Sequence, residues 1–137
     1  MGGIRLDTKQ LKQDIIDYAY TIGIDSIGFT TADPFDELKQ KLEAYHANGY
    51  ASGFEESDIA LRTEPKLSLP TARSIIAIAV GYPNKLKGVP KSVRGDRRGL
   101  FARASWGQDY HTIMRKRLDM LAAFIESKVP DVEIKSM

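Results

Sequence analysis

Apolar side chains recur every three or four residues in two long segments, which is the spacing of one face of an α-helix. Residues 8–22 form the first segment, where Thr8 is placed to cap the helix and Gly23 to end it. Residues 106–128 form the other, and Pro130 breaks it. The predicted buried positions are Leu11, Ile15, Tyr18, Ala19 and Ile22 in the first helix and Tyr110, Met114, Leu118, Leu121 and Ile125 in the other.

A further helix is predicted to open at Asp33 and Pro34, because a carboxylate N-cap followed by proline favours helix initiation. Asn48 and Gly49 end it, and the chain then runs irregularly to residue 70, apart from a short helix at 58–62. The predicted buried stripe of the longer helix is Phe35, Leu38, Leu42 and Tyr45.

Strands are predicted between these helices. Residues 74–80 are apolar on both faces, as in a central strand that is covered on both sides. Residues 24–30 and 132–135 read as further strands, and residues 101–105 as extended chain or a short strand. Strands separated by helices favour an α/β fold, with a small sheet of about three or more strands flanked by helices. Because the last strand begins as the sequence stops, we expect a single domain over residues 1–137, truncated at its C-terminus.

The composition is that of a globular protein, with 42% hydrophobic and 28% charged residues in a chain of 137. The N-terminus has no apolar signal region and the longest apolar run is too short to cross a membrane, so we expect a cytoplasmic protein. There is no cysteine, which excludes thiolate zinc sites and cysteine-ligated iron–sulfur clusters from this chain. Glycine-rich nucleotide motifs and the Gly-x-Ser-x-Gly elbow of hydrolases are also absent.

The net charge of +2 hides a local excess of positive charge in residues 85–103. Only Asp96 opposes the basic side chains there, which are Lys85, Lys87, Lys91, Arg94, Arg97, Arg98 and Arg103. Together with the flanking Tyr82 and Phe101, this basic loop suits an RNA backbone or a cofactor phosphate. The alternative is a solvated loop without a ligand.

A second candidate lies where the basic loop meets the long helix, at residues 103–111. Ser105 and Gln108 have the spacing of a capping box, and a helix start offers free N–H groups to a ligand. Asp109 is then a carboxylate whose pKa the helix lowers, which opposes a role as a general acid, whereas His111 titrates near neutrality. The structural alternative is that Asp109 only complements the helix dipole.

A third candidate is the acidic run of Glu55, Glu56 and Asp58, with Arg62 nearby. Paired carboxylates can carry out acid–base catalysis. An exposed acidic turn next to an arginine is the simpler interpretation.

Several segments match a known family in order along nearly the whole chain, and Ser-Trp-Gly-x-Asp-Tyr-His at 105–111 is the most specific of them. The others are residues 24–33, residues 49–56, Arg62 with Pro65, Leu69 and Pro70, residues 97–104, and Lys-Ser-Met at 135–137. In these segments the chain resembles the epoxyqueuosine reductases. The resemblance implies a cobalamin enzyme that reduces an epoxide on a modified tRNA base to an alkene, with electrons from [4Fe–4S] clusters in a following ferredoxin-like region.

By position, the resemblance implies that Arg62, the Ala102 backbone and Arg103 contact the cofactor. Tyr110 and His111 match residues near the reaction centre, with Asp109 as their neighbour. The family continues Lys-Ser-Met into Val-Asp-Thr-Gly, and that aspartate looks like its proton donor.

This chain stops at Met137 and lacks the cluster cysteines, so we expect an N-terminal portion that is inactive alone. The alternatives are a non-catalytic RNA-binding module that uses residues 85–103, and a structural α/β domain without a ligand.

Overall fold

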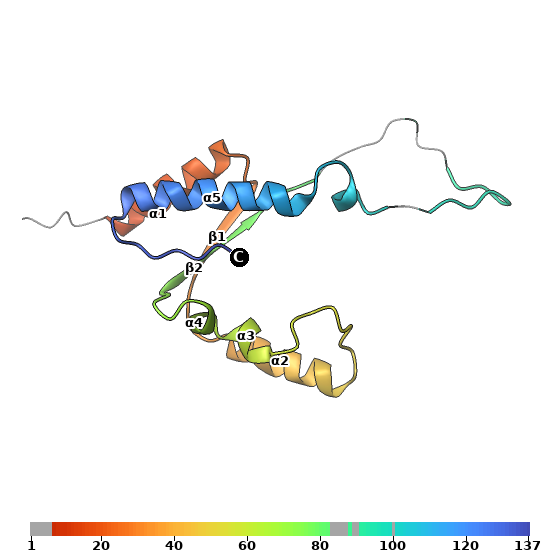
Figure 1. Cartoon of the computed structure of the whole chain (residues 1–137), viewed down its shortest axis with the longest axis horizontal. Helices are drawn as coiled ribbons and strands as arrows, with labels where there is room; N and C mark the ends of the chain where they lie inside the picture. The colour runs from red at the N-terminus through yellow and green to blue at the C-terminus, as the bar shows by residue number, and fades with distance from the viewer. Residues whose placement is uncertain (1–6, 83–87, 89–90, 100) are drawn as a thin grey trace, which may run out of the picture. The chain divides into compact units, whose positions relative to one another are not determined.

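The computed structural model describes residues 7–82, 88, 91–99 and 101–137 (Figure 1). The elements in chain order are α1 (Thr8–Thr21), β1 (Ser26–Thr31), α2 (Asp36–Ala47), α3 (Ile59–Thr63), α4 (Pro65–Ser68), β2 (Ser74–Ala79), the 3₁₀ helix η1 (Arg103–Ser105) and α5 (Tyr110–Lys128). The chain divides into two compact units. Unit 1 is Met1–Ile27, Ile78–Val132 and Ser136–Met137, and unit 2 is Gly28–Ala77 and Glu133–Lys135.

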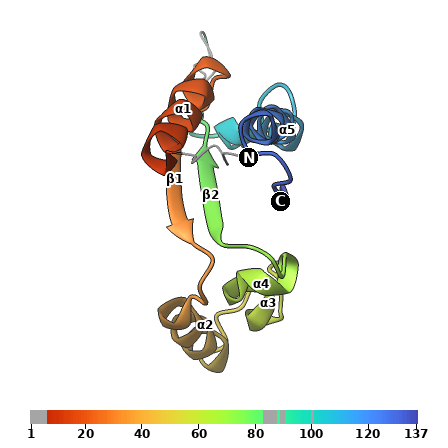
Figure 2. The same cartoon turned by 90° about the vertical axis from the view of Figure 1, so that its left-hand side faces the viewer.

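The α/β class is confirmed, and β1 and β2 are hydrogen-bonded neighbours that run antiparallel (Figure 2). Backbone hydrogen bonds extend the pairing past the strand ends, from Asp25 N to the Ala79 carbonyl (3.0 Å) and from Ala32 N to the Arg73 carbonyl (3.1 Å). In the described part of the chain the sheet has these two strands, so the expectation of three or more is wrong for that part.

Residues 132–135 do not form the predicted third strand. Side chains hold this segment instead: the Thr71 hydroxyl bonds the Glu133 carboxylate, and Lys135 Nζ donates to the Ser68 carbonyl at 3.0 Å. A strand needs a ladder of backbone hydrogen bonds, which side-chain contacts do not provide. The expected cover on both faces of β2 is also wrong, because Ile75, Ile76 and Ile78 are only half-buried. The other residues of the strand, Ser74, Ala77 and Ala79, are exposed.

In unit 1, α1 is capped one residue earlier than predicted. The Asp7 carboxylate, not Thr8, accepts hydrogen bonds from the backbone N–H groups of Lys9 (2.9 Å) and Gln10 (3.3 Å).

The predicted stop of α1 at Gly23 is confirmed. Gly23 has a φ of +80°, its N–H donates to the Tyr20 carbonyl (3.2 Å), and Ile24 N donates to the Ala19 carbonyl (3.0 Å). These are the two bonds of a Schellman motif. Ala19 and Ile24 are 0% and 2% exposed, so the turn also seals part of the core.

The helices α1 and α5 lie side by side in unit 1 (Figures 1 and 2). The rings of Tyr18 and Phe124 stack with centroids 4.1 Å apart and planes inclined by 7°. Ile15 and Leu121 are 5% and 3% exposed, as their helical spacing predicted. Tyr110 was wrongly placed on this buried face, because it lies in the first turn of α5 and is 53% exposed.

In unit 2, α2 begins at Asp36 rather than at the predicted Asp33 and Pro34. The Phe35 N–H donates to the Thr63 carbonyl at 2.9 Å, which ties the chain to α3 just before the helix starts. The stop at Gly49 is confirmed, and a second Schellman turn brings the rings of Tyr45 and Tyr50 edge to face at 5.6 Å. Two predicted core positions are wrong: Leu38 and Tyr45 are 42% and 41% exposed.

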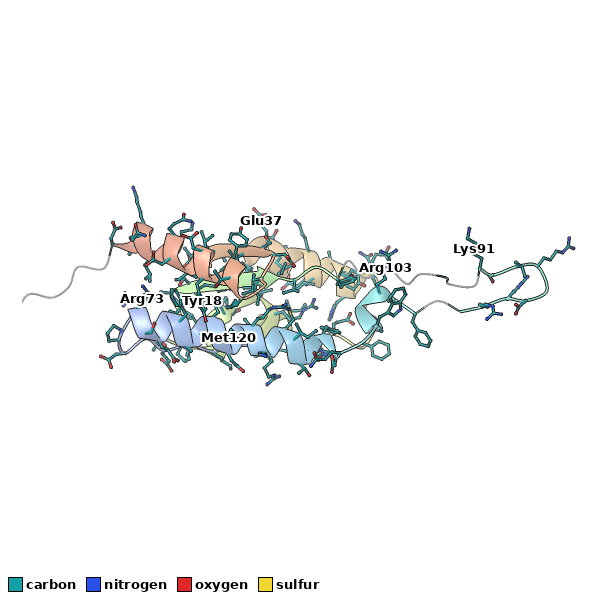
Figure 3. The ribbon with its side chains drawn as sticks, turned by 90° about the horizontal axis from the view of Figure 1, so that it is seen from above. Tyr18, Glu37, Arg73, Lys91, Arg103 and Met120 are labelled. Carbon is teal, nitrogen blue, oxygen red and sulfur yellow. The ribbon has the colours of Figure 1, made fainter. Side chains whose placement is uncertain are left out.

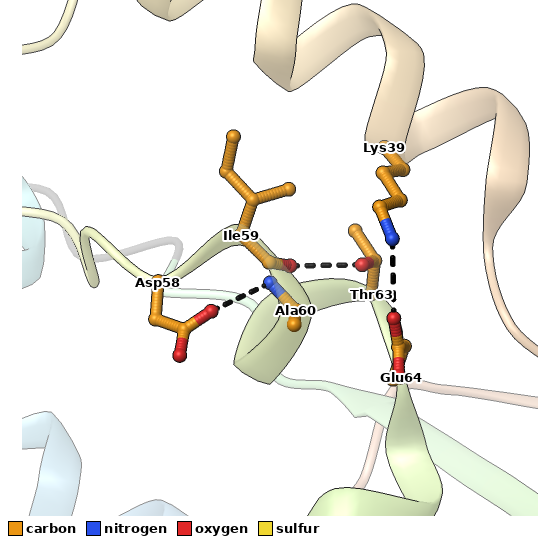
Figure 4. Close-up of polar contacts among 6 residues, drawn as sticks. All are labelled: Lys39, Asp58, Ile59, Ala60, Thr63 and Glu64. Atoms are coloured by element: carbon orange, nitrogen blue, oxygen red, sulfur yellow. Dashed lines mark hydrogen bonds and ion pairs between the residues drawn. The ribbon is translucent and has the colours of Figure 1, made fainter.

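The short helix α3, predicted at 58–62, is present and is anchored on both sides (Figure 4). Asp58 caps it by accepting from Ala60 N at 2.9 Å, and the Thr63 hydroxyl donates to the Ile59 carbonyl at 2.8 Å. Just after it, Glu64 pairs with Lys39 of α2 at 3.2 Å. No helix in the described ranges is both long and apolar enough to span a bilayer.

Gly23 gives a test of the turn that ends α1. A Cβ at Gly23 would lie 3.1 Å from Arg117 Nη2, and Arg117 Nε donates to the Ile22 carbonyl at 3.2 Å. Gly23→Ala is expected to lower the free energy of unfolding by about 1–2 kcal/mol, because the left-handed conformation is unfavourable for alanine. Gly28→Ala, where nothing lies within 4 Å of the added carbon, is the control in a urea titration. Equal stabilities for the two variants would contradict this account.

Candidate functional site

The junction before α5 is a compact turn rather than the predicted start of a helix at residue 106. Ser105 N donates to the Ala102 carbonyl at 2.9 Å and forms η1, and Trp106 Nε1 donates to the Phe101 carbonyl at 3.2 Å. Gly107 then adopts a φ of +84°, which interrupts helical geometry. The extended chain or short strand predicted over residues 101–105 is wrong for residues 103–105, which form η1.

Asp109 is the N-cap of α5, so the predicted capping box of Ser105 and Gln108 is wrong. Its Oδ1 accepts from the backbone N–H of His111 (2.9 Å) and lies 3.0 Å from His111 Nδ1. The backbone N–H of His111, and secondarily its side chain, hold the pKa of Asp109 below the ordinary 3.8. Asp109 is therefore ionised at neutral pH, which makes it a poor proton donor and a good partner for the imidazole.

Two neighbouring side chains, Asp109 and Tyr110, orient the imidazole ring of His111. The Asp109 carboxylate favours a proton on Nδ1, which leaves Nε2 as the nitrogen available to another group. The Tyr110 ring stacks on the imidazole with centroids 4.0 Å apart and planes inclined by 28°. The side chains of His111 and Asp109 are 69% and 64% exposed. The junction thus presents a fixed but accessible imidazole.

An open depression of about 420 Å³ runs from His111 along α5. It is lined by His111, Thr112, Arg115, Lys116, Asp119 and Met120. Sequence reasoning missed Arg115 and Asp119, although they follow His111 at intervals of four residues, which places them on the same helix face.

Ala102 and Arg103 lie at the start of this junction, and both are exposed. In Figure 3, Arg103 sits at the turn that precedes α5. The structure therefore brings Ala102, Arg103, Asp109, Tyr110 and His111 into one short stretch of unit 1.

Arg62 belongs to unit 2, where it lies half-buried on α3. Its neighbour Thr63 is 1% exposed, which fixes this turn of the helix. Within the described residues, no ion pair or hydrogen bond of the Arg62 guanidinium is found. A half-buried cation with no partner among these residues is suited to an anionic or carbonyl-bearing ligand.

The acidic residues near Arg62 have structural roles. Glu55 accepts hydrogen bonds from the hydroxyl and the N–H of Ser52. The Ser52 hydroxyl, then the backbone N–H of Glu55 itself and that of Ser52, lower the pKa of Glu55 to about 2. Glu56 accepts from Asp58 N at 3.0 Å, and Asp58 caps α3. The carboxylates thus shape their own turn, although none of the ion pairs in the described residues joins them to Arg62.

The basic loop is described in part. Lys85 and Lys87 lie outside the described residues, whereas the other predicted members are exposed, namely Lys91, Arg94, Arg97, Arg98 and Arg103. The flanking aromatic residues Tyr82 and Phe101 are 59% and 83% exposed. Across the described ranges there is no group of histidine, aspartate or glutamate residues that could hold a metal ion.

Comparison with known proteins identifies the chain's relatives. The family described as "Epoxyqueuosine reductase QueG, DUF1730" matches residues 62–137, more than half of the chain. The chain belongs to the epoxyqueuosine reductase family. An epoxyqueuosine reductase of Staphylococcus aureus is 99% identical over all 137 residues, which make up 36% of that relative. The chain thus spans about a third of the length of the family members it matches.

Solved structures of epoxyqueuosine reductases agree with this assignment. The Bacillus subtilis enzyme, described with its aspartate-bearing catalytic loop swung out of the active site, is 55% identical and superposes with a TM-score of 0.86. The match covers 94% of this chain and 35% of that one. An epoxyqueuosine reductase in complex with an epoxyqueuosine-modified tRNA-Tyr stem loop is also 55% identical, with a TM-score of 0.85 over 94% of this chain and 34% of that one.

The Asp109 cap predicts a local dependence on pH. Because the folded-state pKa of Asp109 is depressed, its stabilising effect is present above pH 3.8 and is lost as the pH falls through the depressed value. At pH 6, Asp109→Ala is expected to lower hydrogen-exchange protection of the His111 and Thr112 amides. Asp109→Asn, which keeps a cap oxygen but does not titrate, is expected to retain most of it. If both variants protect these two amides as well as the wild type does, Asp109 does not act as the cap.

Proposed function

We propose that this chain is the N-terminal portion of a cytoplasmic epoxyqueuosine reductase, which reduces epoxyqueuosine in tRNA to queuosine with the help of cobalamin. The observation that carries the proposal is the 105–111 turn, in which Asp109 and Tyr110 orient an accessible His111. The relative solved with a modified tRNA stem loop supports the substrate class. The reduction breaks the epoxide C–O bonds, forms a C=C bond and releases the oxygen as water, which consumes two electrons and two protons.

The residues of the junction suit cobalamin, a large ring that carries apolar faces, amide side chains and a phosphate. At the junction, Phe101 and Tyr110 offer exposed aromatic surface and Arg103 offers an exposed cation. Arg62 is not part of the junction: it is a half-buried cation of unit 2, proposed as a cofactor contact from the family resemblance. Bound cobalamin would supply the electrons for the reduction. The proposed role of Arg62, Arg103 and the Ala102 backbone is to hold the cofactor by hydrogen bonds and charge.

His111 is proposed to hold a proton or hydrogen bond at Nε2, beside the departing oxygen. Its Asp109 partner would stabilise the protonated ring and fix its orientation, as a positioning residue. Because its pKa is lowered, Asp109 is ionised at neutral pH and has no proton to donate. The direct proton source is therefore assigned to the aspartate that follows Met137 in the family. The iron–sulfur clusters likewise require cysteines that this chain does not contain.

Cofactor titration tests the proposal directly. Cob(II)alamin added to the full-length enzyme is expected to shift its visible absorption spectrum in a saturable way. The same titration of residues 1–137 measures how much of the affinity belongs to this portion. No spectral change with either protein would refute the role of cobalamin.

Substitutions in the full-length enzyme test the site residues. Arg62→Gln is expected to reduce cobalamin occupancy. His111→Gln is expected to lower kcat about 10²-fold with occupancy retained, since a side chain positioned for acid–base assistance contributes on this scale. Arg73→Gln is the control, because Arg73 is an exposed arginine of the same unit as Arg62. Activity and occupancy equal to the control in both variants would rule out these assignments, provided that circular dichroism shows all three to be folded.

A further inference from the structure

The basic loop contains a small hairpin that the sequence did not predict. Val93 and Asp96 form an antiparallel bridge in which each backbone N–H donates to the other residue's carbonyl, at 3.2 and 3.0 Å. Arg94 and Gly95 make the turn between them, and Gly95 has a φ of +88°. A positive φ at this position is typical of type II turns and favours glycine. The loop therefore has a defined tip rather than a purely solvated course.

Two further contacts fasten the base of this hairpin. Arg98 N donates to the Ser92 hydroxyl at 3.0 Å, and Arg98 Nη2 pairs with Asp96 Oδ2 at 3.0 Å. Asp96, the only acidic residue within 91–98, is thus paired with Arg98.

The remaining cations of the hairpin are Lys91, Arg94 and Arg97. All three are exposed, and no ion pair found in the described residues involves them. In Figure 3 the Lys91 side chain points to solvent from the loop. The three residues are spaced three positions apart, so they form a row along the sequence, with Lys91 before the bridge, Arg94 at the tip and Arg97 after it. A single small phosphate would engage only part of such a row, whereas a polynucleotide backbone presents phosphates in series.

We propose that the hairpin at residues 91–98 binds the phosphodiester backbone of the tRNA substrate through Lys91, Arg94 and Arg97. The inference rests on the proposed function for the identity of the RNA. The hairpin carries no information on base sequence, because contacts to phosphates position an RNA without reading it.

A charge-neutralising variant tests the row of cations. In the full-length enzyme, Arg94→Gln combined with Arg97→Gln is expected to weaken binding of a fluorescein-labelled tRNA anticodon stem-loop at least tenfold. The slope of log affinity against log salt should become shallower by about 1.4–1.8, as expected when two phosphate contacts are lost. Lys9→Gln with Lys41→Gln, on α1 and α2, changes the net charge equally and is expected to leave the slope unaltered. Equal slopes for the two double variants would overturn the proposal.

A second variant keeps every charge and alters the shape of the tip. Gly95→Ala is expected to weaken binding of the stem-loop several-fold, because the turn requires a positive φ. Gly99→Ala, whose backbone has no such requirement, is the matched control and should bind like the wild type. If Gly95→Ala also binds like the wild type, the hairpin geometry has no role.

Turnover and cofactor binding separate this proposal from the proposed function. The Arg94 and Arg97 double variant is expected to raise KM for the modified tRNA with kcat and cobalamin binding unchanged. A loss of cobalamin with unchanged RNA affinity would assign the cations to a cofactor phosphate and overturn the RNA role. A wild-type enzyme that binds the stem-loop but does not reduce epoxyqueuosine would instead refute the proposed function.

Discussion

The packing of α1 against α5 is the interaction on which the candidate site depends. Its contacts lie in the middle and the C-terminal half of α5, where Arg117 donates to the Ile22 carbonyl at the end of α1 and Phe124 stacks on Tyr18 of α1. Leu121 is buried between these two positions in the sequence. The first turn of α5 lies outside these contacts and stays exposed. The packing therefore fixes the body of α5 and leaves the residues at its N-terminal end accessible, namely Asp109, Tyr110 and His111.

Helical periodicity predicted the long helices well, because it reflects burial that the structure retains at Ile15, Ala19 and Leu121. The helix starts were predicted less well. Asp7 replaces Thr8 because its carboxylate, one residue earlier, reaches the free N–H groups. A tertiary hydrogen bond from Phe35 to Thr63, which no local pattern encodes, accompanies the later start of α2. The glycine stops were correct because a left-handed residue is a purely local requirement.

The candidate site was foreseen in outline from the start of a helix and from the resemblance of residues 105–111 to the family. The lowered pKa of Asp109 opposes a role as a general acid, and the geometry gives this carboxylate a different role. The same oxygen that caps the helix also faces the imidazole of His111. The contact between residues two apart in sequence depends on the cap conformation, which spacing does not reveal. The hairpin at residues 91–98 was not foreseen, because its signal is one Gly95 in a run of charges.

The sheet has a consequence for how the chain behaves at high concentration. The run Ser-Ile-Ile-Ala-Ile-Ala of β2 carries neither charge nor proline, and the described residues pair only one of its two edges. Nothing in this run repels a foreign strand, and the open backbone groups are a template for adding one. Concentrating the chain would therefore favour self-association by addition of a strand at the free edge of β2.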